Sequence, residues 1–250
     1  MSRYDFTAPR LFIDAPLAAD ANIPLERDQA NYLLNVLRLG KGGRILVFNG
    51  RDGEWLASLR ASSRKAASLS IVEMSRAQGP GCDLHFLFAP LKHARLDYMI
   101  QKAVEMGASC LMPVITRRTQ VARVNLERMR ANAIEAAEQC GILNIPDIAE
   151  PQQLDCLLAS WPAGRRLIFC DEDEAVADPV AALRAAIPEP NAKLALIIGP
   201  EGGFDDGERD LIRRLAGAVP LSLGPRILRA DTAAVAALAV VQAAIGDWLG

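Results

Sequence analysis

Two short segments near the C-terminal end of the chain have the residue types and spacing of a cofactor pocket. Residues 197–204 read IIGPEGGF and residues 221–232 read LSLGPRILRADT. Each segment predicts an apolar strand that runs into a Gly-Pro corner, followed by the start of a helix. In open α/β sheets, ligands bind beyond the carboxyl ends of the strands, where glycine lets the backbone approach the ligand closely. If the two strands are neighbours, the two corners line one pocket.

This predicted pocket differs from the common nucleotide-phosphate loops. Gly199, Gly202 and Gly203 do not have the G-x-G-x-x-G spacing, and the chain contains no G-x-x-x-x-G-K-[ST] loop. Proline fixes φ and removes an N–H, so the corners are expected to be stiff and to offer mainly carbonyl groups. Such a pocket favours the edge of a nucleoside over a polyphosphate. Two ordinary strand-to-helix turns are the alternative, because Gly and Pro are common in such turns.

The length and composition of the chain are those of a globular protein. At 250 residues, with 51% hydrophobic and 23% charged residues, the chain is typical of one large or two smaller globular domains. Its five cysteines form no C-x-x-C pair, so the sequence predicts neither a metal site nor a disulfide framework, and a reducing cytoplasm is the expected compartment. The first residues lack the apolar core of a signal peptide. The apolar run at 233–241 is shorter than the ~18 residues of a membrane span, so we expect no membrane partner.

The distribution of charge is more informative than its total. A net charge of −2 argues at first against nucleic acid, since phosphate binding depends on Lys and Arg. However, basic residues are in excess in residues 1–76 and again between 92 and 130, whereas acidic residues gather at 171–174 and 205–210. The protein can therefore present a basic face. The alternative is that these clusters are ordinary solvated surface charge.

The pattern of the first third of the chain predicts a small β-rich unit, expected to be a barrel. Alternating apolar residues and turn residues indicate short strands. Their predicted ranges are 10–13, 44–49, 54–60 and 67–74, with a hairpin turn at 50–53 and one helix at 28–37. In that helix Tyr32, Leu33, Val36 and Leu37 form the expected apolar face. We place the first domain at 1–75, a linker rich in Gly and Pro at 76–82, and a second domain at 83–250.

The second domain alternates apolar strands with helices. Continuous apolar runs are typical of parallel strands that are covered on both faces. The predicted strands are 84–89, 110–115, 167–170, 194–198 and 219–223, and the predicted helices are 96–106, 126–140, 179–186, 206–215 and 232–249. This alternation predicts an α/β fold with a parallel sheet.

Five motifs in order resemble a known family over essentially the whole chain: the RsmE-type 16S rRNA uracil-N3 methyltransferases of the SPOUT class. The segments IGPEGGF (198–204) and LGPRILR (223–229) are similar to its two cofactor loops. Further similar segments are QKAVEMG (101–107), EQCG (138–141), and, near the start, PRLF (9–12) with VLR (36–38). The chain departs from the family at Tyr32, Ile142 and Asp231, where members usually carry His, Arg and Glu.

The resemblance implies a PUA-like N-terminal barrel that binds RNA and a C-terminal α/β domain whose chain forms a trefoil knot. It also implies S-adenosylmethionine as the cofactor, a homodimer, and no metal. The implied substrate is 16S rRNA, within the small ribosomal subunit, where a uridine of the decoding-region helix is methylated at N3.

Site residues follow from the chemistry that this reaction needs. Negative charge spreads to the uracil oxygens as N3 loses its proton, and Arg229 is the candidate to stabilise it. Glu201 is expected to orient the cofactor or to receive a proton, and Asp231 is expected to be a helix N-cap. Leu223, Ile227 and Leu228 are expected to form apolar walls. The full predicted cofactor set is Cys170, Ile198, Gly199, Pro200, Glu201, Gly202, Leu223, Gly224, Ile227, Leu228 and Thr232.

RNA contacts are expected from basic side chains. The family's basic positions correspond to Arg10, Arg38, Lys92 and Arg118, and Arg123 is a further candidate. Two other functions remain open on the residues alone. One is a small-molecule enzyme with a nucleotide-type cofactor, which would act without RNA. The other is a non-catalytic RNA-binding module, which would bind RNA but not S-adenosylmethionine.

Overall fold

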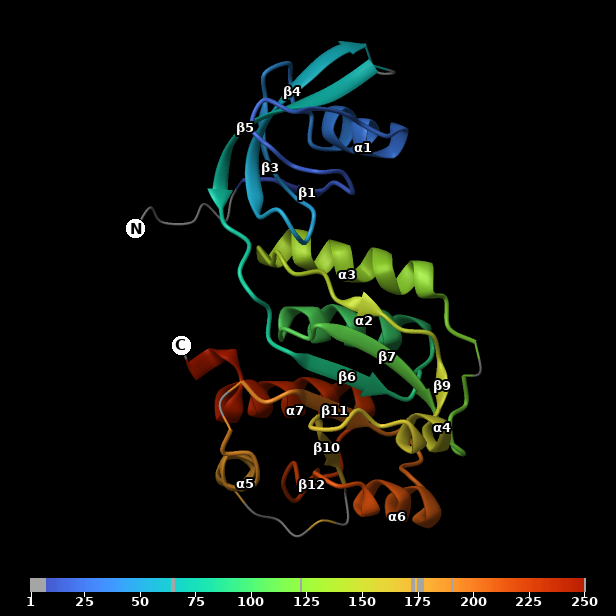
Figure 1. Ribbon diagram of the computed structural model, residues 1–250. Helices are drawn as coiled ribbons and strands as arrows, with labels where there is room; N and C mark the ends of the chain where they lie inside the picture. Colours follow the sequence, from blue (N-terminus) through green and yellow to red (C-terminus); the bar gives the residue numbers. More distant parts are fainter. Residues whose placement is uncertain are drawn as a thin grey trace. The chain divides into compact units, whose positions relative to one another are not determined.

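The computed structural model describes residues 8–63, 66–121, 123–171, 174, 178–189 and 191–249, and all structural statements below concern these residues. The chain divides into two compact units (Figure 1). The N-terminal unit comprises residues 1–80 together with 137–145, and the C-terminal unit comprises residues 81–136 and 146–250. A short segment from the middle of the chain therefore belongs to the N-terminal unit.

A five-stranded sheet forms the N-terminal unit, in the order β1-β3-β4-β5-β2. Its strands are β1 (Arg10–Phe12), β2 (Asn22–Pro24), β3 (Arg44–Phe48), β4 (Glu54–Ser63) and β5 (Ala66–Arg76). The pair β1–β3 is parallel and the other pairs are antiparallel. Along β4, Ala57 and Leu59 are fully buried because alternate residues of a strand face the core. The four predicted strands are present, and β2 is an addition too short to leave a pattern.

The predicted helix at 28–37 is present but has two parts. It consists of α1 (Arg27–Asn31) followed by a π-helical turn (Tyr32–Val36). Leu33 is fully buried and Leu37 packs against the core, whereas Tyr32 and Val36 are exposed. The expected apolar face is therefore wrong at two of its four positions. The wider π turn changes the angular spacing of side chains, so α-helical periodicity no longer predicts which of them face inward.

The C-terminal unit is built on a parallel sheet, as the sequence predicted. The strand order is β12-β10-β11-β6-β7-β8, and β9 also pairs with β7. All of these pairs are parallel. The strands are β6 (Leu84–Phe88), β7 (Cys110–Ile115), β8 (Asp147–Ile148), β9 (Gln152–Gln153), β10 (Arg166–Cys170), β11 (Leu194–Ile198) and β12 (Ala218–Leu221). All five residues of β11 are buried, which explains its continuous apolar run.

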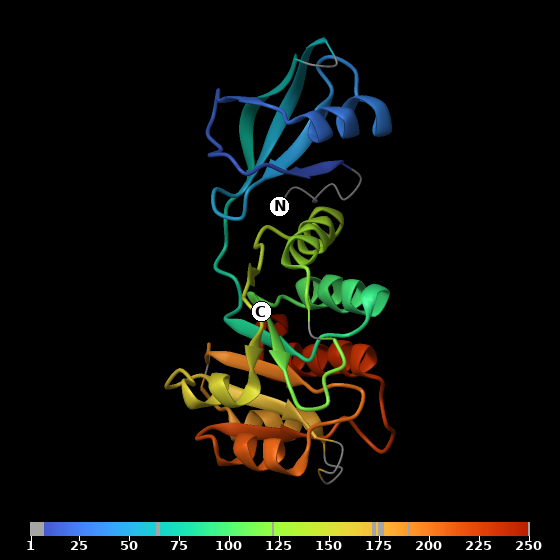
Figure 2. The ribbon, with the colours of Figure 1, turned by 90° about the vertical axis from the view of Figure 1, so that its right-hand side faces the viewer.

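Helices connect these strands and cover the sheet (Figure 2). They are α2 (His93–Glu105), α3 (Leu126–Cys140), α4 (Leu154–Ala159), α5 (Pro179–Ala186), α6 (Asp206–Arg214) and α7 (Ala230–Ile245), followed by a 3-10 turn (Asp247–Leu249). Leu157 of α4 and Ile212 of α6 belong to a core cluster with Leu87, Phe169 and Ile197 of the strands. Helix α7 packs against α2, α5 and β11. The short α4 was not predicted.

Helix α7 ends earlier than its apolar composition predicts. The predicted helix ran to residue 249, but α7 stops at Ile245 and Gly246 follows with an extended backbone. The cause is Gln242, a fully buried polar residue. Its amide donates to the carbonyl of Met106 at 2.6 Å and accepts from the backbone N–H of Asp247 at 2.9 Å. This side chain satisfies a backbone donor that no longer has a helical partner.

Candidate active site

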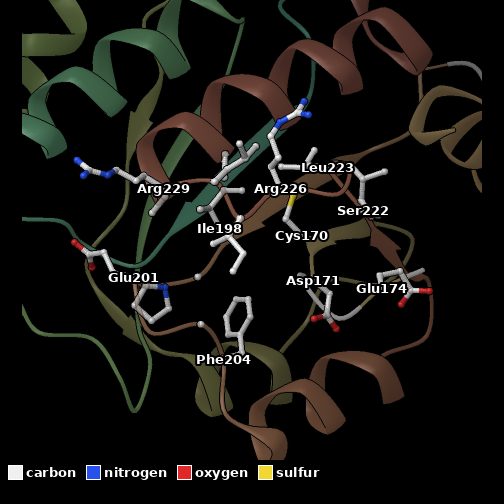
Figure 3. A pocket seen from close by; sticks show the side chains of 18 of the residues that line it. Cys170, Asp171, Glu174, Ile198, Glu201, Phe204, Ser222, Leu223, Arg226 and Arg229 are labelled. Atoms are coloured by element: carbon white, nitrogen blue, oxygen red, sulfur yellow. The ribbon is translucent and has the colours of Figure 1, made fainter. Parts of the chain in front are cut away.

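A cavity of about 710 Å³ opens at the carboxyl ends of β10, β11 and β12 (Figure 3). The segments 198–204 and 221–230 both line it, so the two predicted corners share one pocket. Their strands are not adjacent, because β10 lies between β11 and β12 and contributes Cys170 to the wall. The predicted cofactor residues that line the cavity are Cys170, Ile198, Gly199, Pro200, Glu201, Leu223, Gly224, Ile227 and Leu228.

The first loop, residues 199–204, has a fixed shape. Gly199 packs against the ring of Phe204, and a Cβ at this position would lie only 3.0–3.3 Å from three ring atoms. The N–H of Gly203, which has φ +68°, donates to the carbonyl of Pro200 at 2.9 Å. Glycine suits both positions, because a Cβ at residue 199 would press on the Phe204 ring and the left-handed backbone at residue 203 favours glycine. The loop therefore presents a preformed edge to the cavity.

A turn after β7 braces this loop from outside the cavity. The guanidinium of Arg118 donates to the carbonyl of Gly202 and packs over it. The neighbouring Arg117 forms an ion pair with Asp205 at 3.0 Å, and its N–H donates to Glu208 at 2.8 Å. Gly202 faces this turn and lies outside the cavity lining. It is therefore not among the residues that we assign to the cofactor.

The second loop, residues 222–229, is more open. Gly224 has φ +97°, and a Cβ added there would meet no atom within 4 Å, so its backbone faces free space. Leu223 and Leu228 are half-buried, as expected for apolar walls. Ile227, by contrast, is 90% exposed at the rim. Ile227 therefore lines the cavity only at its rim and does not form an enclosed wall.

Arg229 lies at the cavity mouth as the N-cap residue of α7. Among the described residues its side chain has no hydrogen bond or ion pair, and it is exposed. The positive end of a helix dipole disfavours a cation, so this position does not stabilise the fold by electrostatics. The guanidinium is therefore available to a ligand.

The expectation that Asp231 is the N-cap is wrong by two residues, since α7 begins at Ala230. Asp231 lies in the first turn, where its carboxylate accepts the N–H of Thr232 at 3.1 Å. It still complements the helix dipole, which does not require the cap position itself. Thr232 is exposed and lies outside the cavity lining, so it too is not assigned to the cofactor.

Arg95 is a cavity residue that the sequence did not identify. It comes from the first turn of α2, and its guanidinium lies 3.3 Å from the carboxylate of Glu201 and 4.0 Å from that of Asp231. It thus joins α2, the first loop and α7. Nothing local in the sequence marks Arg95, because its partners are more than 100 residues away.

The opposite end of the cavity holds a second group of unpredicted residues (Figure 3). The Asp171 carboxylate is almost fully buried and lies 2.9 Å from Arg213 and 3.6 Å from Arg209. Next to it, burial and then the charge of Asp171 raise the pKa of the Cys170 thiol to about 12. Cys170 is therefore a neutral wall residue and not a nucleophile. Glu174 completes this end through an ion pair with Arg213 at 3.2 Å.

The predicted RNA-contacting residues do not share one environment. Lys92, Arg118 and Arg123 are exposed in the C-terminal unit, and Lys92 precedes Arg95 by less than one turn. Arg38 is exposed in the N-terminal unit, with a left-handed backbone at φ +54°. These four side chains are accessible to a ligand.

Arg10 is the exception, and its expected role is corrected. It is 7% exposed and forms a buried ion pair with Glu54 at 2.8 Å. Its other two nitrogens donate to the carbonyls of Ala137, Glu138 and Ile142 at the C-terminal end of α3. All three nitrogens are engaged within the protein and the residue is buried, so it is not accessible to an RNA phosphate. Arg10 instead fixes the end of a helix whose carbonyls attract a cation.

Two further kinds of site are not found in the part of the chain that the structure describes. No group of three or more His, Cys, Asp and Glu side chains there is placed to hold a metal ion. Within the same residues, no helix has the length and apolar character needed to cross a membrane.

Comparison with protein families defines the class to which this fold and cavity belong. A model described as an RNA methyltransferase domain matches residues 78–242. A second model, described as an RNA methyltransferase PUA domain, matches residues 25–72. The cavity therefore lies in the part of the chain that carries the methyltransferase match, and the five-stranded unit carries the PUA match.

Comparison with individual relatives identifies the family within this class. Ribosomal RNA small subunit methyltransferase E of Rickettsia conorii is 31% identical over 93% of this chain and 94% of its own length. The protein of the same name from Synechocystis is 32% identical over 94% of this chain and 78% of its own. The chain belongs to the family of ribosomal RNA small subunit methyltransferases E.

Solved structures agree with this placement. The methyltransferase E of Neisseria gonorrhoeae, bound to S-adenosyl methionine, superposes with a TM-score of 0.84 at 26% identity, over 94% of this chain and 97% of its own. A protein of Legionella pneumophila in complex with the same cofactor gives a TM-score of 0.78 at 30% identity, over 95% of this chain and 98% of its own.

Proposed function

We propose that this protein transfers the methyl group of S-adenosylmethionine to N3 of a uridine in 16S rRNA, in the decoding-region helix. One observation carries the proposal: both loops line a single cavity at the carboxyl ends of parallel strands, and Arg229, unpartnered among the described residues, lies at its mouth. The names of the relatives support ribosomal RNA as the substrate, and the cofactor bound to two similar structures supports the donor.

The residues of the cavity fit this cofactor. Gly199 and Gly224 line the cavity with backbone atoms, and only at Gly224 would an added Cβ meet no atom within 4 Å, while Ile198, Leu223 and Leu228 offer apolar walls. We assign these residues to the adenosine part, because backbone polar groups and apolar walls suit the edge and face of a purine. When bound, the cofactor supplies an electrophilic methyl group on a sulfonium. The contacts of Gly199 with Phe204 and of Gly203 with Pro200 hold the shape of the first loop, and preorganisation of this kind reduces the ordering cost of binding.

Arg229 and Glu201 are the proposed catalytic residues. N3 of uracil carries a proton, and its loss spreads negative charge onto the two uracil oxygens. The guanidinium of Arg229 would donate to such an oxygen and stabilise this charge as it develops. Glu201, on the facing loop, would receive the proton or orient the cofactor. Cys170 has no part in this chemistry, since its pKa of about 12 keeps the thiol protonated.

RNA binding is assigned to the exposed basic residues of both units. These are Arg38, Lys92, Arg118 and Arg123. Contacts with phosphates fix the register, while a base flipped into the cavity provides the specificity. Because binding of this kind releases counterions, affinity for RNA should fall steeply between low and moderate salt. Affinity that changes little over this range would contradict the assignment.

The remaining properties come from the resemblance of the loop motifs and are proposals of the same kind. They are a trefoil knot around the cofactor, a homodimer, action within the small ribosomal subunit, and a cytoplasmic location. Residues 1–75 would serve as the RNA-binding domain, 76–82 as the linker and 83–250 as the methyltransferase domain.

Two measurements test the function against its alternatives. The first is calorimetric titration of the protein with S-adenosylmethionine, and the second is methyl transfer to naked 16S rRNA, isolated small subunits and free nucleosides. We expect cofactor binding, and transfer that requires RNA. Transfer to nucleosides alone would favour a small-molecule enzyme. Binding of RNA without binding of the cofactor would favour a non-catalytic RNA-binding module.

A further inference from the structure

Arg95 occupies an unusual position for an arginine. It lies in the first turn of α2, which contains no acidic residue and whose N-cap, Lys92, makes no side-chain capping bond. Two cations at the positive end of a helix are unfavourable for the helix. The carboxylates that compensate Arg95 come from elsewhere: Glu201 of the first loop and Asp231 of α7.

The stability of the fold does not account for this arrangement. The side chains of Arg95 and Glu201 are each 37% exposed, and ion pairs of this exposure contribute about 0–1 kcal/mol. The contact with Asp231 is longer still, at 4.0 Å. However, Arg95 and Glu201 both line the cavity, where a bound base would exclude water. Electrostatic interactions strengthen when water leaves, so this cluster becomes important only when the site is filled.

We propose that Arg95 is a positioning residue that acts through Glu201. It holds the Glu201 carboxylate at the cavity mouth and, through Asp231, ties the first loop to the start of α7, which carries Arg229. This inference rests on the proposed function, because it assigns a task within the same reaction. Arg95 and Arg229 therefore have different tasks: Arg229 is free to contact the substrate, whereas Arg95 is engaged by the protein and contacts Glu201.

The test is a double-mutant cycle with Arg95→Ala, Glu201→Gln and the double variant. For each protein we would measure kcat, the KM for RNA, the affinity for S-adenosylmethionine and the thermal midpoint. We expect Arg95→Ala to lower kcat about tenfold or more by misplacing Glu201, with cofactor affinity and midpoint nearly unchanged. The double variant should be no slower than Glu201→Gln alone, because Arg95 has no task without its partner. Arg95→Lys should restore part of kcat.

A matched control is Arg214→Ala. Arg214 forms an exposed ion pair with Asp210 at 3.5 Å in α6, away from the cavity lining, so its loss should leave all four quantities unchanged. The inference would be overturned if the fold-losses in kcat of Arg95→Ala and Glu201→Gln multiplied in the double variant. An Arg95→Ala effect confined to the KM for RNA would also overturn it. Failure of the proposed function is a separate result, visible as a wild-type protein that does not bind the cofactor or methylate RNA.

Discussion

Each unit contains an arginine–carboxylate cluster, and the two clusters differ in every physical respect. In the N-terminal unit, Glu54 is fully buried between Arg10 and Arg76, at 2.8 and 3.0 Å. In the C-terminal unit, Arg95 is partly exposed between Glu201 and Asp231, at 3.3 and 4.0 Å. In the first cluster the ion-pair distances are short and the carboxylate is inaccessible to solvent. In the second the distances are longer, the side chains are partly exposed, and Arg95 and Glu201 line a cavity. The residue types alone therefore do not tell an ion pair that stabilises the fold from one that lines a ligand cavity.

The buried cluster owes its charge state to its neighbours. Burial by itself would raise the pKa of Glu54, but hydrogen bonds from Arg76 and Arg10 outweigh it and hold the pKa below its ordinary value. The Arg76 guanidinium also donates to the carbonyl of Gly141, and the N–H of Phe12 donates to the Glu138 carboxylate at 2.8 Å. Two motifs far apart in the sequence, PRLF and EQCG, therefore meet around one ionic core. Their residues maintain the fold.

The largest effect is expected from disrupting the buried cluster of Glu54, Arg10 and Arg76. Glu54→Gln leaves two arginines without their counter-charge, and removing one partner of a buried pair costs about 3–5 kcal/mol. Urea denaturation followed by circular dichroism would measure the loss. Arg76→Gln should cost less, since the Arg76 side chain is 34% exposed. The matched control is Asp14→Asn, which removes an exposed pair with Arg51 at 3.6 Å and should cost less than about 1 kcal/mol. Equal losses of unfolding free energy in Glu54→Gln and Asp14→Asn would contradict the proposed difference between buried and exposed ion pairs.

The next largest effect is expected on kcat, from a substitution at the cavity of the C-terminal unit. Arg229→Ala removes the guanidinium at the cavity mouth, and we expect kcat to fall about 100-fold to 1,000-fold, as for loss of one donor to a developing anion. Thermal stability should not change, in contrast to Glu54→Gln. Calorimetry should show cofactor affinity largely intact. Loss of affinity together with kcat would mean that Arg229 shapes the pocket. Arg226, an exposed arginine of the same loop that also lines the cavity, provides the comparison variant Arg226→Ala, which should lower kcat much less than Arg229→Ala.

A smaller effect tests the preformed first loop. The methyl group of Gly199→Ala would press on the Phe204 ring, and overpacking of this kind costs about 1–3 kcal/mol. We expect weaker binding of S-adenosylmethionine in calorimetry. Phe204→Leu combined with Gly199→Ala should recover part of the affinity by relieving the contact. Gly79→Ala serves as the control, because no atom lies within 4 Å of its added Cβ. Unchanged affinity in Gly199→Ala would show that the loop does not hold the cofactor.

The smallest effect is the pH dependence of the buried cluster. A carboxyl whose pKa is lowered by folding stabilises the protein fully above its unfolded pKa, near 4.5, and this contribution disappears as the pH falls through the folded pKa. The free energy of unfolding of the wild type should therefore decrease more steeply below pH 4.5 than that of Glu54→Gln. Denaturation curves between pH 6 and 3.5 would measure the difference. Parallel pH profiles would show that Glu54 is not the group responsible.

Local patterns predicted most of the secondary structure. Continuous apolar runs predicted the parallel strands β6, β7, β10, β11 and β12, and Gly-Pro corners predicted the loops that line the cavity, because both depend on near neighbours in the chain. The same reasoning failed where local and tertiary preferences diverge. The π turn at Tyr32–Val36 exposed two apolar residues, and the side chain of Gln242 ended α7 four residues before its predicted end. The two-residue strands β8 and β9 were too short to leave a periodic signal.

The sequence by itself determined the alternation of the longer strands and helices, the two loops and the candidacy of Glu201 and Arg229, since each depends on contiguous residues. Only the tertiary structure decided which arginines are free to act. Arg10 meets Glu54 across 44 residues and Arg95 meets Glu201 across 106. Burial and ion pairing depend on such distant partners. For this physical reason Arg10, a residue of a predicted RNA-binding motif, is buried in the fold, whereas Arg95, which belongs to no motif, lines the candidate active site.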